Sequence, residues 1–226
     1  MQIRFHNFKP SIHFFKEMIR GGTPSLCRQG LASLATIFLN RTAGFYGDAA
    51  IAGMSIVSRI SMFAYSALLG FGQGFQPVCG FNYGAGKNER VLEAFWFCVK
   101  YAFLFLLVVG AAGFVFAPDL VALFRKDDLD VIAVGTVALR YQIIALPLSS
   151  WIVLCNMMLQ SIGKGLKASI VASARQGLCF IPLIFILPHF LGLFGVEICQ
   201  AVADVLTLVI SVPIGMSVIK EMRRIA

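Results

Sequence analysis

Six apolar segments, each long enough to cross a lipid bilayer, follow one another along this chain with only short turns between them. They cover about residues 24–46, 49–80, 92–123, 131–162, 166–187 and 196–219. A bilayer core is about 30 Å thick, so a spanning α-helix needs about 20 predominantly apolar residues. We therefore predict an all-α fold, that of a polytopic membrane protein whose spans form a six-helix transmembrane bundle.

The composition excludes most other classes of protein. Of the 226 residues, 58% are hydrophobic and 13% are charged, whereas soluble domains carry about 25% charged residues. This excludes a water-soluble globule, a disordered tail and a nucleic-acid reader. The net charge of +8 fits basic loops beside a lipid bilayer better than a nucleic-acid partner.

The charges of the predicted loops indicate how the bundle is oriented. Loops on one side carry eleven basic residues: Arg4, Lys9, Lys16, Arg20, Lys87, Arg90, Lys164, Lys167, Lys220, Arg223 and Arg224. Loops on the other side carry Arg125 and Lys126 among the acids Asp48, Asp119, Asp127, Asp128 and Asp130. Basic residues concentrate in cytoplasmic loops, and residues 1–22 lack the apolar core of a signal peptide. We expect a multi-pass protein of the plasma membrane with both termini in the cytoplasm.

Charged side chains inside the predicted spans are candidates for function, because burying charge in a bilayer is costly. Counted at about 1.5 Å per residue, Arg59, Arg140 and Asp204 lie about 12–15 Å below the outer face, whereas Arg28 and Arg175 lie near the inner side. In a structural interpretation, Asp204 pairs with Arg140 or Arg59 and holds helices together. In a functional interpretation, Asp204 lies in a water-filled cavity and binds a proton or a cation.

Two identical stretches, Arg28-Gln29-Gly30-Leu31 and Arg175-Gln176-Gly177-Leu178, lie at the inner ends of two helices that run in the same direction. An arginine in this position can extend its side chain to the membrane interface. The match is either chance or a shared structural role, and the equal placement favours the shared role.

A glycine-rich segment at residues 70–86 superficially suggests a phosphate-binding loop. It follows no predicted strand, and Lys87-Asn88 is not the ending of a P-loop, so we reject a nucleotide site. The chain has no hydrolase or metalloprotease motif, its six cysteines show no CxxC spacing, and its three histidines lie apart. We expect neither an enzyme nor a metal site. The polar residues of the segment, Gln76, Asn82 and Tyr83, remain unusual for a membrane helix.

The same segment resembles the multidrug and toxic compound extrusion (MATE) family of transporters. The pattern Gln76-Pro77-x-x-Gly80-x-Asn82-Tyr83-Gly84-Ala85-Gly86, followed by Arg90, is similar to the family's helix-to-loop motif. The resemblance continues in order through Gln160, Gly163, Lys164, Arg175-Gln176-Gly177-Leu178, Pro182, Pro188, Gly192, Gly195 and Asp204. It runs from about Gly21 to the C-terminus and is closest to the MepA-like branch.

The resemblance implies an antiporter without a cofactor, which exports cationic, amphipathic drugs while protons or sodium ions enter. Members of the family have two six-helix lobes around a central cavity, and this sequence matches the second lobe only. On this basis residues 1–23 are a cytoplasmic linker, residues 24–219 the lobe and residues 220–226 a cytoplasmic basic tail. We take as the candidate pathway for cation and substrate the residues Asp204, Arg140, Arg59, Arg175, Gln176, Gln76, Asn82 and Tyr83.

The chain departs from the family pattern in its acidic residues. The first lobe, which in many members carries an acidic cation site, has no counterpart here, and the segment 24–46 contains no Asp or Glu. We therefore expect a half-transporter or a truncated reading frame that needs a first lobe or a parallel homodimer. The alternatives are an inactive fragment or non-transporting membrane subunit, and a lipid-linked oligosaccharide flippase of the same superfamily.

Overall fold

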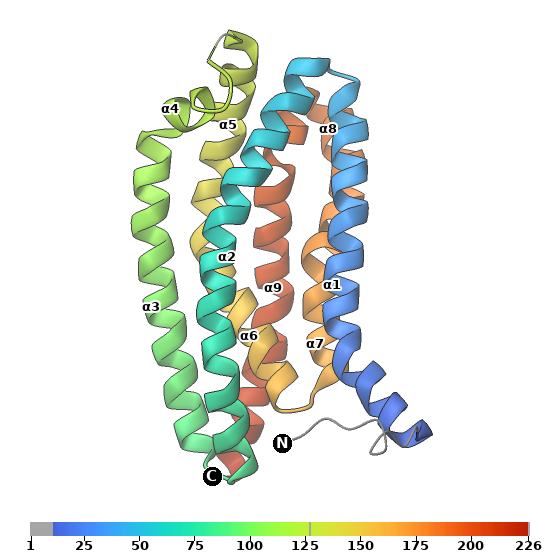
Figure 1. The fold of residues 1–226 in the computed structure, drawn as a ribbon, viewed down its shortest axis with the longest axis vertical. Helices are drawn as coiled ribbons and strands as arrows, with labels where there is room; N and C mark the ends of the chain where they lie inside the picture. The colour runs from blue at the N-terminus through green and yellow to red at the C-terminus, as the bar shows by residue number, and fades with distance from the viewer. Residues whose placement is uncertain (1–10, 127, 226) are drawn as a thin grey trace, which may run out of the picture.

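Long helices packed side by side form the whole of the described structure (Figure 1). The computed structural model describes residues 11–126 and 128–225. Its helices are α1 (Ile12–Gly44), α2 (Asp48–Gly84), α3 (Asn88–Val115), α4 (Ala117–Ala122), α5 (Leu129–Ala145), η2 (Leu146–Leu148), α6 (Ser149–Ser161), α7 (Gly165–Ser173), η3 (Ala174–Cys179), α8 (Phe180–Leu191) and α9 (Leu193–Ile225). No strand occurs among these residues, and the predicted all-α bundle is confirmed.

Two of the six long rods are assembled from shorter helices. Residues 129–161 join α5 to α6 through the 3₁₀ turn η2, which contains Pro147. Residues 165–191 join α7 to α8 through the π-helical turn η3. In the described part of the chain, five rods have the length and apolar composition of a membrane span, namely residues 48–84, 88–115, 129–161, 165–191 and 193–224.

The sixth rod, α1, begins earlier than the sequence predicted. We expected the first helix to begin near Pro24, but α1 begins at Ile12 and has 33 residues. A proline inside a helix removes a hydrogen bond and bends the helix rather than always ending it. Figure 1 shows the first turns of α1 directed away from the rest of the bundle.

The loops gather at two opposite ends of the bundle, as their charges predicted (Figure 1). At one end, Lys164 in the turn after α6 forms an ion pair with Glu221 near the C-terminal end of α9. Asn88, which begins α3, donates a hydrogen bond of 3.4 Å to the Met222 carbonyl at the same end. The acidic loop between α4 and α5 lies at the other end. The grouping of the basic loops is therefore confirmed, and their cytoplasmic location remains a prediction.

Reporter fusions test this orientation. Because basic loops stay on the cytoplasmic side, fusions at Lys87, Lys164 and Arg224 should report the cytoplasm, and a fusion at Asp128 should report the outside. Paired phosphatase and fluorescent-protein reporters at each position make the assay independent of expression level. A cytoplasmic signal at Asp128 would contradict the six-span topology.

Two apolar clusters stabilise the bundle at different levels along its length. One, nearer the basic end, includes Leu68, Phe95 and Met158. The other, nearer the acidic end, includes Leu139 and Ile184. Residues of both clusters, among them Ile152 and Phe180, border one space that polar side chains also line.

Candidate functional site

A buried ion pair joins Arg175 of η3 to Asp204 of α9. The Arg175 Nε lies 2.7 Å from Asp204 Oδ1, and its Nη2 lies 3.2 Å from Oδ2. Asp204 is 2% exposed, so both carboxylate oxygens are shielded from solvent within the lobe. This two-point geometry between a planar guanidinium and a carboxylate is the strongest form of such a pair.

Two neighbours complete the cluster around the pair. Gln200, one turn before Asp204 on α9, donates a hydrogen bond of 3.0 Å from Nε2 to Asp204 Oδ1. Tyr65 of α2 presents its ring face to Arg175, whose guanidinium carbon lies 4.4 Å from the ring centroid. A cation over an aromatic face is attracted by the electrons of the ring. The cluster therefore connects η3, α9 and α2.

The position of Arg175 depends on the π-helical turn η3. Six residues, Ala174–Cys179, form this turn between α7 and α8. Single π-helical turns inside α-helices occur frequently at functional sites. Gly177 in the same turn packs directly against α1, since a Cβ atom at Gly177 would lie 2.7 Å from Leu31 Cδ1. The second Arg-Gln-Gly-Leu stretch therefore contacts the first.

The structural interpretation named the wrong partner for Asp204. That interpretation paired it with Arg140 or Arg59, but Asp204 pairs with Arg175. Arg59 is exposed on α2, and the Arg140 guanidinium carbon lies over Phe114 of α3, 5.3 Å from the ring centroid. Counting residues along each helix ignored the direction in which a side chain leaves the helix and the reach of arginine.

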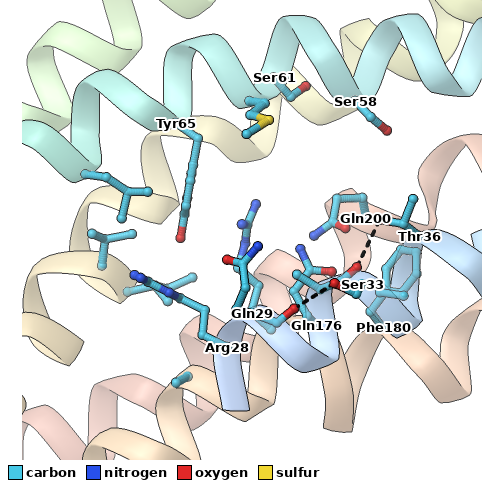
Figure 2. Close-up of a pocket in the computed structure, with 18 of the residues that line it drawn as sticks. Arg28, Gln29, Ser33, Thr36, Ser58, Ser61, Tyr65, Gln176, Phe180 and Gln200 are labelled. Atoms are coloured by element: carbon cyan, nitrogen blue, oxygen red, sulfur yellow. Dashed lines mark hydrogen bonds between the residues drawn. The ribbon is translucent and has the colours of Figure 1, made fainter. Parts of the chain in front are cut away.

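A cavity of about 400 Å³ adjoins this cluster. One wall comes from α1, whose polar lining residues are Arg28, Gln29, Ser33 and Thr36. Figure 2 shows these side chains facing α2 across the cavity, where Ser58, Ser61 and Tyr65 project toward them. Another wall comes from the helices from α5 to α9 and includes the polar residues Gln142, Asn156, Arg175, Gln176 and Gln200. The space is thus lined by groups that donate and accept hydrogen bonds.

The structure brings only some of the predicted pathway residues together. Arg175 and Gln176 line the cavity, and Asp204 lies directly behind it. Gln76, Asn82 and Tyr83 lie toward the end of α2 and are outside the cavity lining. Asn82 donates a hydrogen bond of 2.9 Å to the Val78 carbonyl of its own helix. Any role for these three residues in transport remains a prediction.

Several residues near the ion pair were not among the candidates predicted from the sequence. Gln200 precedes Asp204 by four residues, a spacing that places two side chains on one helix face and could have identified it. Glu197, seven residues before Asp204 on the same face, is 8% exposed and is a second buried acid. The contribution of Tyr65 could not be found from spacing, because it lies on another helix.

Comparisons with known proteins identify a family and similar sequences. The family model described as MatE matches residues 24–186. The chain is 29% identical over 190 residues to multidrug export protein MepA of Staphylococcus aureus strain MSSA476, covering 83% of this chain and 41% of that protein.

Two solved structures of multidrug resistance MATE family transporters of the MOP superfamily are also similar. An outward-facing conformation has a TM-score of 0.88 and 28% identity, covering 99% of this chain and 50% of the other. An inward-facing conformation has a TM-score of 0.85 and 28% identity, covering 98% and 52%. The chain therefore spans about half the length of the proteins that it matches.

Proposed function

The chain belongs to the MatE family, and from this premise we propose that it forms one lobe of a cation-coupled antiporter that exports amphipathic small molecules. The polar cavity beside the buried Arg175–Asp204 pair is the observation that carries the proposal. Its relatives include a multidrug export protein, and the family consists of membrane transporters rather than enzymes. In this proposal residues 24–219 are the lobe, with a linker before it and a basic tail after it.

A second lobe is part of the proposal. Alternating access works by rocking two bundles against each other around a central site, and the chain covers about half of each matched transporter. The described bundle resembles about half of an outward-facing and about half of an inward-facing structure almost equally well, with TM-scores of 0.88 and 0.85. This agreement supports a lobe that moves as one body.

We propose that the coupling ion is a proton and that Asp204 receives it. Arg175 occupies both carboxylate oxygens of Asp204, and Gln200 donates to one of them. A sodium ion would have to displace these donors, whereas a proton adds to a carboxylate oxygen directly. Protonation removes the negative charge that holds Arg175, so the guanidinium becomes free to turn toward the cavity. In this proposal, the protonation state of Asp204 controls whether the Arg175 side chain stays paired or turns toward the cavity.

The cavity lining also bears on the charge of the exported compound. The family resemblance implies cationic drugs, but the described lining of this cavity contains two arginines and no Asp or Glu. A cationic compound would therefore find its counter-charge on a second lobe. For this lobe we propose amphipathic compounds, held by the hydrogen-bonding lining and by the Tyr65 ring.

Dye export tests the proposed function. Cells without their own exporters should retain a panel of cationic and anionic dyes when they express this chain alone. They should export at least one dye when the first lobe of a MepA-type relative is expressed beside it, because two lobes complete the cavity. Asp204→Asn should abolish that export, while Asp119→Asn, at an exposed acid of α4, should preserve it.

The outcomes separate this proposal from its main rival. The half-length match favours a non-transporting subunit or inert fragment as the second candidate. That candidate predicts no export with or without the first lobe, and equal behaviour of the two variants. Export by the chain alone would instead contradict the need for a second lobe.

A further inference from the structure

The two Arg-Gln-Gly-Leu stretches meet at one cavity. Arg28 and Gln29 line it from α1, and Arg175 and Gln176 line it from η3. Leu31 of the first stretch fills the space beside Gly177 of the second. The repeated sequence therefore places two arginines and two amide side chains around one space.

The two arginines differ in their partners. Arg175 has its charge compensated by Asp204 on α9. Arg28 is half-buried, and no ion pair or hydrogen bond of its guanidinium occurs among the residues that the structure describes. With no acidic side chain in the described lining, the cavity retains one uncompensated positive charge.

An uncompensated, half-buried guanidinium beside a cavity favours an oxyanion as its partner. Its planar fork of N–H donors matches the oxygens of a carboxylate, sulfonate or phosphate, and a low local dielectric strengthens the attraction. Figure 2 shows Arg28 and Tyr65 at the same end of the cavity, with Gln29 beside them. The Tyr65 hydroxyl and the Gln29 amide can donate further hydrogen bonds to the same group.

We propose that Arg28, with Gln29 and Tyr65, forms an anion subsite that takes the acidic group of an amphipathic molecule. This inference rests on the proposed function, since it names the substrate class of the same cavity. The acidic group comes either from a soluble compound or from the headgroup of an anionic lipid.

Binding of two matched dyes tests the subsite without any transport. The purified chain in nanodiscs of phosphatidylcholine is titrated with fluorescein, which is anionic, and with a cationic rhodamine of the same ring system. Fluorescence anisotropy should show fluorescein bound at least about tenfold more tightly, the scale of one charge-assisted hydrogen bond. Tighter binding of the rhodamine by the unmodified chain would overturn the proposal, and this comparison needs no variant.

Variants of Arg28 test whether this residue is responsible for the binding of fluorescein. Arg28→Gln should weaken fluorescein binding by about tenfold and leave rhodamine binding unchanged or stronger. Arg28→Lys should weaken it less, because lysine keeps the charge and loses the planar fork. Arg41→Gln, at an exposed arginine of α1 outside this cavity, is the matched control and should bind as the unmodified chain does. Equal fluorescein affinity for Arg28→Gln and the unmodified chain would overturn the proposal.

The source of the anion is distinguished by adding phosphatidylglycerol to the nanodiscs. The negative surface of these nanodiscs repels fluorescein in every variant. If a lipid phosphate fills the subsite, phosphatidylglycerol weakens fluorescein binding more in the unmodified chain than in Arg28→Gln. If the subsite serves soluble compounds, phosphatidylglycerol weakens fluorescein binding by the same factor in both. Since these assays measure binding, a chain that binds fluorescein through Arg28 but exports nothing beside a first lobe would refute only the proposed function.

Discussion

Replacing Asp204 with alanine should lower the free energy of unfolding of the lobe by about 3–5 kcal/mol, the cost of leaving one member of a buried ion pair without its partner. The Arg175 guanidinium loses both carboxylate contacts, and Gln200 loses its acceptor. Titration with dodecyl sulfate in mild detergent, followed by tryptophan fluorescence, measures the change. Trp96 and Trp151 lie in the bundle and pack against each other, with ring centroids 5.7 Å apart.

A double-mutant cycle identifies the partner. Adding Arg175→Ala to Asp204→Ala should restore a large part of the lost stability, because it removes the unpaired charge. Adding Arg140→Ala instead should restore none, since Arg140 lies over Phe114 and does not contact Asp204. Asp204→Asn should be less harmful than alanine, as the amide oxygen still accepts from Gln200. Recovery by Arg140→Ala alone would contradict the observed pairing.

Replacing Gly195 with alanine should destabilise the lobe by about 3 kcal/mol, the upper part of the range for overpacking. Gly195 lies in the first turn of α9, where the chain returns from α8. A Cβ atom there would overlap the Leu187 carbonyl group and lie 2.7 Å from the Pro188 nitrogen. These are backbone atoms, so relief requires α8 and α9 to separate.

Gly72→Ala is the matched control for this prediction. A Cβ atom at Gly72 would meet the thioether of Met157, with the terminal methyl carbon 3.3 Å away. Methionine is unbranched and adapts to irregular space, so the expected loss lies at the lower end of the overpacking range, about 1 kcal/mol. Both variants are measured by the same detergent titration. A larger loss for Gly72→Ala than for Gly195→Ala would show that side-chain overlap, and not backbone overlap, limits packing here.

Much of the fold was predictable from properties that vary along the sequence, namely hydropathy and loop charge. Hydropathy located the spans, because a bilayer imposes one length on every helix that crosses it. Loop charge assigned the turns at Lys87 and Lys164 to one end and the acidic loop at Asp128 to the other, and the helices place them there. Helix ends were less accurate. α1 begins at Ile12 and not near Pro24, since a single proline does not terminate every helix.

The site was predictable only in part. Asp204 and Arg175 stood out because charge is rare and costly inside a membrane. Their pairing did not, because depth along an axis says nothing about rotation around it, and the π-helical turn at Ala174–Cys179 leaves no clear mark in the sequence. Arg28 was noticed as half of a repeated stretch, but nothing along the chain showed that both stretches line one cavity.

The sequence by itself determined the class of the protein, the order of its helices and the two ends of the bundle, because each depends on local composition and on the thickness of a membrane. Only the tertiary structure decided which charges are compensated. The packing of η3 against α9 pairs the single carboxylate of Asp204 with Arg175. Arg28, on the facing helix, is left at the cavity without an acid among the described residues. Charge compensation depends on distances between helices, and these distances are fixed only when all the helices pack together.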